Sequence, residues 1–272
     1  MCKCRNRVKR CFLLLLSIIM IMNNTDMTAF AIESETKVIS ENIVSEQKTF
    51  SSLEGVTRIT GEDRYVTSLL VADTYKEVLG IDKFQAVIIA TGKSFADALS
   101  APYLAYVKKA PILLTDGTDN NVNALHEYIM ANVVAGGKVY IIGGENAVPY
   151  FVEAIEGYDV VRLSGSTRYI TNIEVLEEAG FNSKTLIVAS GREYITGLSA
   201  LALGQPVLLV NTTLSEQQKT VIENSEFEEI YIIGDATSVS ETVEESLKEY
   251  NLPVYRIVGE DYITTSVAVA ET

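Results

Sequence analysis

The chain has 272 residues, 47% of them hydrophobic, which is enough for about two domains that each bury a core of their own. Its 36 acidic and 22 basic residues give a formal net charge of −14 at pH 7, so long-range attraction to nucleic acid is excluded. The three cysteines, Cys2, Cys4 and Cys11, lie near the N-terminus, in a segment that we expect to be removed. The remaining chain has no thiol, which excludes disulfides and thiolate chemistry.

Residues 1–31 have the layout of a cleavable secretory signal. Five Lys or Arg residues precede an apolar run at residues 11–22, and Ala29 and Ala31 then stand at positions −3 and −1 of a cleavage site. The alternative is an uncleaved membrane anchor, but this run is short for a bilayer span, which takes about 20 residues. We therefore expect a secreted protein that begins near Ile32 and has no membrane attachment after cleavage.

Residues 32–55 are polar and acidic and show no sustained periodicity, which predicts a flexible leader. Cleavage of the signal removes five basic residues and one acidic residue, and it leaves 17 basic and 35 acidic residues with a net charge of −18. An anionic partner must therefore bind at a local cluster of basic side chains.

The sequence RITGEDRYVTSLLVA at residues 58–72 recurs as RLSGSTRYITNIEVL at 162–176 and as RIVGEDYITTSVAVA at 256–270. Four further landmarks recur in the same order between the first two copies: ATGKSFADALSA and ASGREYITGLSA, PILLT and PVLLV, VYIIGG and IYIIGD, NAVP and TSVS. The copies start about one small α/β domain apart. Five ordered matches predict a duplicated domain, with copies at 56–161 and 162–255 and an incomplete third copy at 256–272.

The first copy alternates between strand and helix patterns. Asp63 is the predicted N-cap of a helix at 64–79 that ends at Gly80. The expected strands are 56–59, 86–90, 111–114, 138–142 and the 160–163 connection, and the further helices are 95–107, 121–132 and 148–155.

The second copy repeats this order. Its expected strands are 185–189, 207–210 and 229–233, and its helices are 195–203, 215–224 and 240–250. Strands that alternate with helices predict an α/β fold with parallel sheets and helices on both faces. Residues 264–272 of the third copy cannot fold as a domain, so either the chain is a fragment or this segment packs on an earlier copy.

Catalytic and cofactor motifs are incomplete. Gly92-Lys93-Ser94 follows a strand, but a phosphate-binding loop needs a glycine where Val87 stands. Gly143-Gly144 lacks the full dinucleotide spacing and predicts instead a turn with positive φ. A single histidine, His126, cannot supply a Ser-His-Asp set or a metal cluster, so we expect no catalytic residues, cofactor or metal.

Six residues are candidates for binding or for bracing the turns. Arg58, Arg162 and Arg256 precede the glycine turns, Arg64 and Arg168 open the helices that follow, and Asp97 lies beyond the strand at 86–90, where open α/β sheets place ligands. An arginine fork pairs with phosphate and with carboxylate equally well, so these side chains either bind an anionic ligand or hold the turns, for example as an Arg64–Asp97 pair.

RITGEDRYVTS, ATGKSFADALSAP, PILLT and VYIIGG resemble the type 2 cell-wall-binding repeat of Gram-positive surface and S-layer-type proteins. The resemblance runs from residue 56 to the end. It implies tandem Rossmann-like units, usually three around a pseudo-threefold axis, which anchor secreted proteins to an anionic secondary wall polymer. The six candidate residues are the matching motif positions.

The resemblance implies a non-catalytic module at the cell surface, bound to an anionic, teichoic-acid-like wall polysaccharide. Two alternatives stay open, an exported wall-modifying α/β enzyme and a non-functional remnant of a longer surface protein. This sequence departs from the repeat pattern at Thr196, which replaces Asp97, and at Tyr262, which replaces Arg64 and Arg168. The incomplete third copy also leaves self-association possible.

Overall fold

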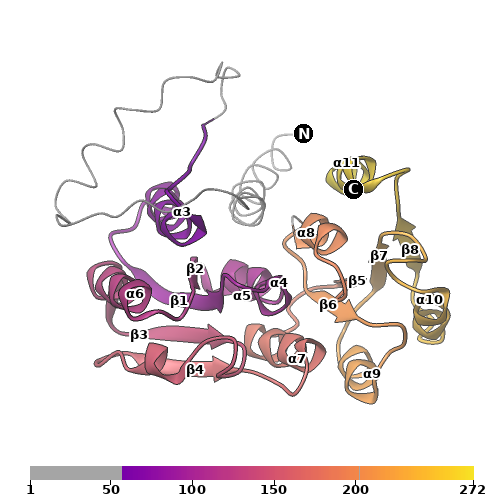
Figure 1. Ribbon diagram of the computed structural model, residues 1–272. Coiled ribbons are helices and arrows are strands. Elements are labelled where there is room, and N and C mark those ends of the chain that lie inside the picture. Colours follow the sequence, from indigo (N-terminus) through magenta and orange to yellow (C-terminus); the bar gives the residue numbers. More distant parts are fainter. Residues whose placement is uncertain (1–56, 202) are drawn as a thin grey trace.

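The computed structural model describes residues 57–201 and 203–272 (Figure 1). The predicted signal peptide, residues 1–31, and the predicted leader, residues 32–55, lie outside the described residues. In the described part of the chain, no helix is long and apolar enough to cross a membrane.

The first sheet has four parallel strands in the order β2-β1-β3-β4. They are β1 Phe84–Thr91, β2 Ile112–Thr115, β3 Val133–Ile142 and β4 Asp159–Leu163. The helices of this region are α3 Arg64–Leu79, α4 Phe95–Ala98, α5 Ala101–Lys108 and α6 Asp119–Asn132, with a 3-10 turn η1 at Tyr150–Glu153. We call this region the first repeat.

Both faces of the first sheet are covered by helices. Successive side chains of β1 point to opposite faces, so they lie in different hydrophobic clusters. Val87 and Ile89 pack in a cluster with Leu125 of α6 and Ala72 of α3. Ile88, from the same strand, lies in a different cluster that includes residues of α5. The uninterrupted apolar run of β1 therefore belongs to a strand buried on both faces, as predicted.

The second sheet repeats the arrangement with the order β6-β5-β7-β8, again entirely parallel. Its strands are β5 Thr185–Ser190, β6 Val207–Val210, β7 Glu229–Ile233 and β8 Val254–Ile257. The helices of this second repeat are α7 Arg168–Ala179, α8 Ile195–Leu201, α9 Glu216–Glu223 and α10 Glu241–Lys248, and α11 Tyr262–Glu271 follows. The predicted α/β class with parallel sheets and helices on both faces is confirmed.

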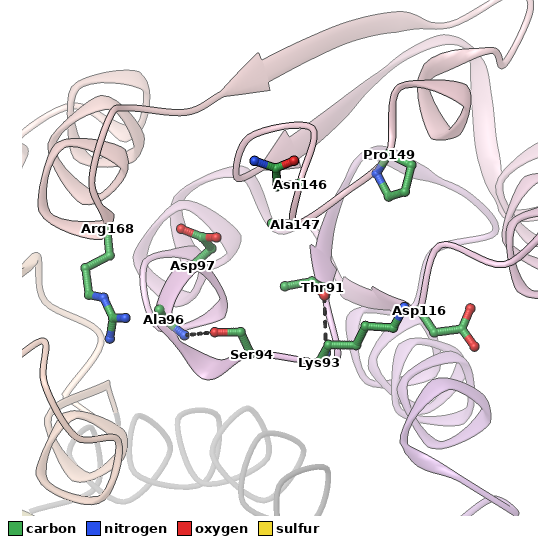
Figure 2. A pocket seen from close by; sticks show the side chains of 10 residues that line it. All are labelled: Thr91, Lys93, Ser94, Ala96, Asp97, Asp116, Asn146, Ala147, Pro149 and Arg168. Atoms are coloured by element: carbon green, nitrogen blue, oxygen red, sulfur yellow. Dashed lines mark hydrogen bonds between the residues drawn. The ribbon is translucent and has the colours of Figure 1, made fainter.

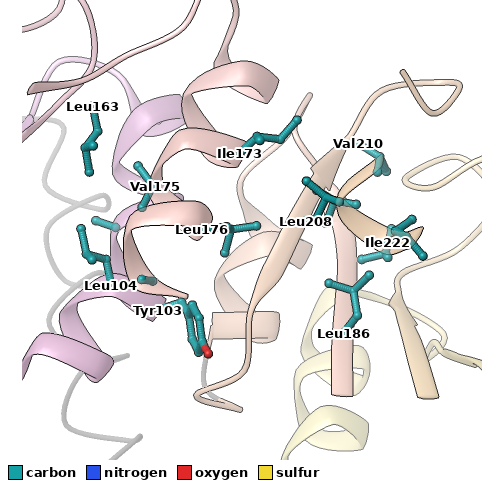
Figure 3. Close-up of a cluster of buried hydrophobic side chains, with 14 of the residues drawn as sticks. Tyr103, Leu104, Leu163, Ile173, Val175, Leu176, Leu186, Leu208, Val210 and Ile222 are labelled. Atoms are coloured by element: carbon teal, nitrogen blue, oxygen red, sulfur yellow. The ribbon is translucent and has the colours of Figure 1, made fainter. Parts of the chain in front are cut away.

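Helix α7 joins the two repeats and lies between the two sheets in Figure 1. Leu176 is buried in one continuous cluster with Leu104 of α5 and Leu208 of β6, as Figure 3 shows. The Tyr140 hydroxyl of β3 donates a hydrogen bond of 2.8 Å to Glu178, and the Tyr103 hydroxyl of α5 donates one of 3.2 Å to the Gly180 carbonyl. The first helix of the second copy thus completes the core of the first copy.

The predicted strand at 56–59 is wrong for its described residues, 57–59, which form no strand. The corresponding segments of the later copies are β4 and β8, which pair with β3 and β7 of the preceding sheet. In the part of the chain that the structure describes, no sheet precedes the first copy, so its segment pairs with no strand there. The predicted limit between residues 161 and 162 falls inside β4, and the repeat limits themselves stay a prediction.

Two helix predictions in the first repeat are also wrong. The helix expected at 95–107 is divided into α4 and α5, because Pro102 stands in the first turn of α5 and cannot donate the backbone hydrogen bond that would continue α4. The helix expected at 148–155 is only the single turn η1, which begins directly after Pro149.

The turns predicted around the glycines are confirmed. Asp63 caps α3 by accepting from the Val66 N–H, and Gly80 ends that helix in the left-handed region. Gly143 and Gly234, which follow β3 and β7, have φ values of 107° and 100°.

The segment of the third copy packs on an earlier copy, which was one of the two expectations for it. Helix α11 packs against α8 of the second repeat, where Val269 is only 1% exposed. Its other face carries the exposed side chains of Ile263 and Val267.

Candidate functional site

A pocket of about 370 Å³ opens at the carboxyl end of the first sheet (Figure 2). This is the edge at which open α/β sheets bind their ligands. The lining comes from the ends of β1, β2 and β3, from α4 and from the first residue of α7: Thr91, Lys93, Ser94, Ala96, Asp97, Asp116, Asn146, Ala147, Pro149 and Arg168.

Two glycines shape this pocket. A Cβ at Gly92 would lie 2.4 Å from Cε1 of Tyr65, so only glycine lets the chain turn from β1 toward α4. A Cβ at Gly143 would lie 2.8 Å from Oδ2 of Asp97, so the absence of a side chain there makes room for the carboxylate. Ser94 caps α4, and its hydroxyl accepts from the Ala96 N–H at 3.4 Å.

Asp97 is the half-buried acid of the pocket. Burial raises the pKa of its carboxyl group, and the positive charge of Arg168 lowers that pKa by a smaller amount. Within the described residues the carboxylate accepts no hydrogen bond, while Arg168 donates one of 2.8 Å to the Gly191 carbonyl and stacks its guanidinium 5.6 Å from the Phe95 ring centroid. Asp97 and Arg168 therefore face one pocket from two different repeats.

The predicted Arg64–Asp97 pair is not formed. Arg64 donates to the Gly92 carbonyl at 2.7 Å, just as Arg168 donates to Gly191. Of the six candidate residues, only Asp97 and Arg168 line the pocket, and Arg58 is an exposed residue ahead of the first sheet.

Arg162 and Arg256 hold the turns that follow β3 and β7. Arg162 is ion-paired with Glu153 and donates to the Gly143 carbonyl at 2.6 Å. Arg256 donates to the Gly234 carbonyl at 2.7 Å and pairs with Glu244 at 2.6 Å. Their side chains are only 16% and 17% exposed, so these guanidinium groups are engaged by the protein itself.

At the matching place of the second repeat, the side chains that correspond to Lys93 and Ser94 bond to neighbouring groups of the protein. Arg192, which corresponds to Lys93, donates to the carbonyls of Thr237 and Ser238 at 2.6 and 2.9 Å. Glu193, which corresponds to Ser94, accepts from the Ile195 N–H at 2.6 Å and bonds to the Thr196 hydroxyl. The loop after β5 is therefore closed onto the loop after β7.

Sequence reasoning missed Lys93, Asn146 and Asp116 as neighbours of Asp97. Each follows the carboxyl end of a strand, and parallel strands bring their carboxyl ends to one edge, so this signal was available. The repeats themselves do not reveal it, because these three positions carry different residues in the two copies.

No catalytic set faces the pocket. His126 lies on α6, where its Nε2 is 3.0 Å from the Val152 carbonyl, and it does not line the pocket. Within residues 57–201 and 203–272, no group of three His, Cys, Asp or Glu residues could hold a metal ion.

The fold and the pocket define a class of protein, tandem α/β repeats that present a polar binding edge. Residues 58–153 and 162–244 match the family described as cell wall binding domain 2, and the chain belongs to this family. It is therefore a cell-wall-binding protein of the cell wall or surface, and the predicted resemblance is confirmed.

Two curated relatives come from Bacillus subtilis (strain 168). N-acetylmuramoyl-L-alanine amidase LytC is 28% identical over 69% of this chain and 38% of its own length. Amidase enhancer is 28% identical over 78% of this chain and 28% of its own length. The chain thus spans less than half of either relative.

Two solved structures from Clostridium difficile have the same fold. Cwp8 superposes with a TM-score of 0.68 at 26% identity, covering 78% of this chain and 36% of Cwp8. Cwp6 superposes with a TM-score of 0.66 at 21% identity, covering 82% of this chain and 38% of Cwp6.

Proposed function

We propose that this chain is a non-catalytic module that anchors a secreted protein, without a covalent bond, to an anionic secondary polysaccharide of a Gram-positive cell wall. The observation that carries the proposal is the family match, which covers both repeats. The relatives support it, because an amidase and an amidase enhancer share this region over only part of their lengths.

Electrostatics permit an anionic partner despite the net negative charge of the chain. Repulsion between exposed charges is screened beyond about 8 Å at physiological salt. Lys93 and Arg168 put two cations at one pocket, which can attract a nearby anionic group. Among the candidate residues we assign polymer contact to Asp97 and Arg168, and we assign bracing of the fold to Arg64, Arg162 and Arg256.

The test is retention of the secreted chain on purified walls. We expect the chain to sediment with intact walls and to stay in solution when the anionic polymers have been extracted from them. Retention should fall as salt is raised. Equal retention on intact and extracted walls would refute an anionic polymer as the partner.

The enzyme alternative is separated in the same samples. A wall-modifying enzyme would release soluble sugar or peptide fragments with time, whereas an anchoring module leaves the walls intact. N-terminal sequencing of the secreted chain tests the export proposal, because cleavage after Ala31 gives a first residue of Ile32, whereas a start at Met1 would overturn it.

A further inference from the structure

The pocket of the first repeat has balanced charge, which is unusual for a site that binds a bare anion. Two cations, Lys93 and Arg168, and two carboxylates, Asp97 and Asp116, line it. The remaining polar groups are neutral, and they include the Asn146 amide and the Ser94 hydroxyl. A phosphate placed here would meet as many negative side chains as positive ones.

The state of Asp97 points to a ligand that donates hydrogen bonds. Its carboxylate is half-buried, lines the pocket and accepts no hydrogen bond from the described residues, so its oxygens are available to a ligand that donates. The hydroxyl groups of a sugar are such donors, whereas a phosphodiester has none. Carboxylate, amide and lysine side chains around one pocket provide both acceptors and donors for a polyhydroxylated ring.

We propose that this pocket binds one sugar ring of the wall polysaccharide through its hydroxyl groups, with Asp97 as the acceptor and Lys93 and Asn146 as donors. The anionic groups of the polymer then lie outside the pocket. The inference rests on the proposed function, since the sugar is a unit of the polymer to which the chain is anchored. The volume of about 370 Å³ lies at the small end of ligand pockets, which suits a single ring.

The second repeat does not offer a second site. Thr196 stands in place of Asp97 and is 3% exposed, and the exposed side chain of Arg192 donates to two backbone carbonyls. The proposed sugar site therefore uses residues that the second repeat does not reproduce at the matching positions.

The isosteric variant Asp97→Asn distinguishes a bound sugar from a bound anion, because the two predict opposite changes in wall retention. It keeps the shape of the side chain and removes one negative charge. If the pocket holds sugar hydroxyls, the variant loses a charged acceptor and retention on intact walls weakens about tenfold. If the pocket holds an anionic group, removal of the neighbouring negative charge strengthens retention.

Two further variants keep the result interpretable. Lys93→Ala, at an exposed lysine, should also weaken retention. Arg192→Ala, at the matching position of the second repeat, should leave it unchanged. Circular dichroism confirms that each variant is folded before binding is measured.

Each outcome decides the proposal. Weaker retention of Asp97→Asn and Lys93→Ala, with Arg192→Ala unchanged, supports it. Unchanged or stronger retention of Asp97→Asn overturns the sugar assignment but leaves wall anchoring intact. If the unaltered chain is not retained on intact walls, the proposed function fails and the sugar site fails with it.

Discussion

In the first repeat the loop after β1 leaves Lys93 exposed and a pocket open, whereas in the second repeat Arg192 and Glu193 close the same loop by bonding to backbone. The braces of the two repeats, in contrast, are nearly identical. The Gly61 N–H donates to Thr67 at 2.9 Å, and the Gly165 N–H donates to Thr171 at 3.0 Å. This comparison teaches that duplication has kept the hydrogen bonds that shape the fold, while the residues at the binding edge have diverged.

A second contrast lies where the first helix of each repeat meets the edge strand. The Ser68 hydroxyl of α3 accepts from the Leu114 N–H of β2 at 3.1 Å. Asn172 of α7 makes two such bonds to β6, one from the Leu209 N–H at 2.9 Å and one to the Val207 carbonyl at 3.0 Å. Both helices therefore hydrogen-bond to the edge strand of their own sheet, α3 through one bond and α7 through two.

The largest expected effect comes from Leu176→Ala in α7. Leu176 corresponds to Ala72 of α3, and it fills the space between α5 and β6. Its truncation should lower the free energy of unfolding by about 2–5 kcal/mol, as measured by urea denaturation.

Hydrogen exchange on the same variant shows whether the two repeats share this loss. We expect amides of both sheets to become less protected, because the helix belongs to both cores. Val78→Ala, at a half-exposed position of α3, is the control and should change stability by less than about 0.5 kcal/mol. Loss of protection in one sheet alone would contradict the shared core.

Asn172→Ala should be the next most damaging change, at about 3 kcal/mol, because it leaves a buried N–H and a buried carbonyl without partners. Ser68→Ala removes one such bond and should cost about 1 kcal/mol. Both values come from chemical denaturation. Equal losses for the two variants would show that the second bond of Asn172 contributes nothing.

Much of the fold could be predicted because apolar runs such as that of β1 are decided by local pattern. The errors lie where a strand depends on a distant part of the chain. Residues 57–59 have the sequence pattern of β4 and β8, but within the described residues they join no sheet. In the candidate site, the position of Asp97 after the end of a strand could be predicted from the sequence. That Arg168 lines the same pocket could not be predicted, because it depends on how the two repeats pack.

Arg256→Gln should lower the free energy of unfolding by about 2 kcal/mol without weakening wall retention. Arg162→Gln should cost less, because one terminal nitrogen of Arg162 has no partner within the described residues, whereas that of Arg256 bonds to Glu244 and to the Val239 carbonyl. Thermal unfolding and wall sedimentation together check this pair. A loss of retention in stable variants would return both arginines to the binding surface.

The Arg256→Gln variant also has a pH signature. Hydrogen bonds from Lys248 and then from Arg256 hold the pKa of Glu244 below its usual range near 4.5. The stability that this carboxylate contributes is complete above about pH 4.5 and is lost as the pH falls through the lower pKa of the folded state. Arg256→Gln should therefore make stability less sensitive to acid than it is in the unaltered chain.

The smallest effect is expected for the stability of Asp97→Asn. Burial holds the pKa of Asp97 above its unfolded value near 3.8, so the favourable contribution of its neutral form is complete below pH 3.8 and is lost as the pH rises through the folded pKa. At pH 7 the variant should melt at a slightly higher temperature than the unaltered chain. The gap should close below about pH 3.8, and a gap that widens there would contradict the assignment.

The position of α7 has a consequence for how such repeats can be cut and joined. A protein expressed from residue 56 to 161 would lack α7, which packs against α5 and β4, and it would expose the side of α5 that carries Leu104 to water. The smallest autonomous piece should instead extend through Gly180, one helix beyond the internal homology. By the same reasoning, the first helix of an extra copy inserted before Arg162 would pack on the copy that precedes it in the sequence. The extra copy would in turn be covered by the first helix of the copy that follows it. A repeat can therefore be inserted between two others without leaving an exposed apolar surface at either of its boundaries.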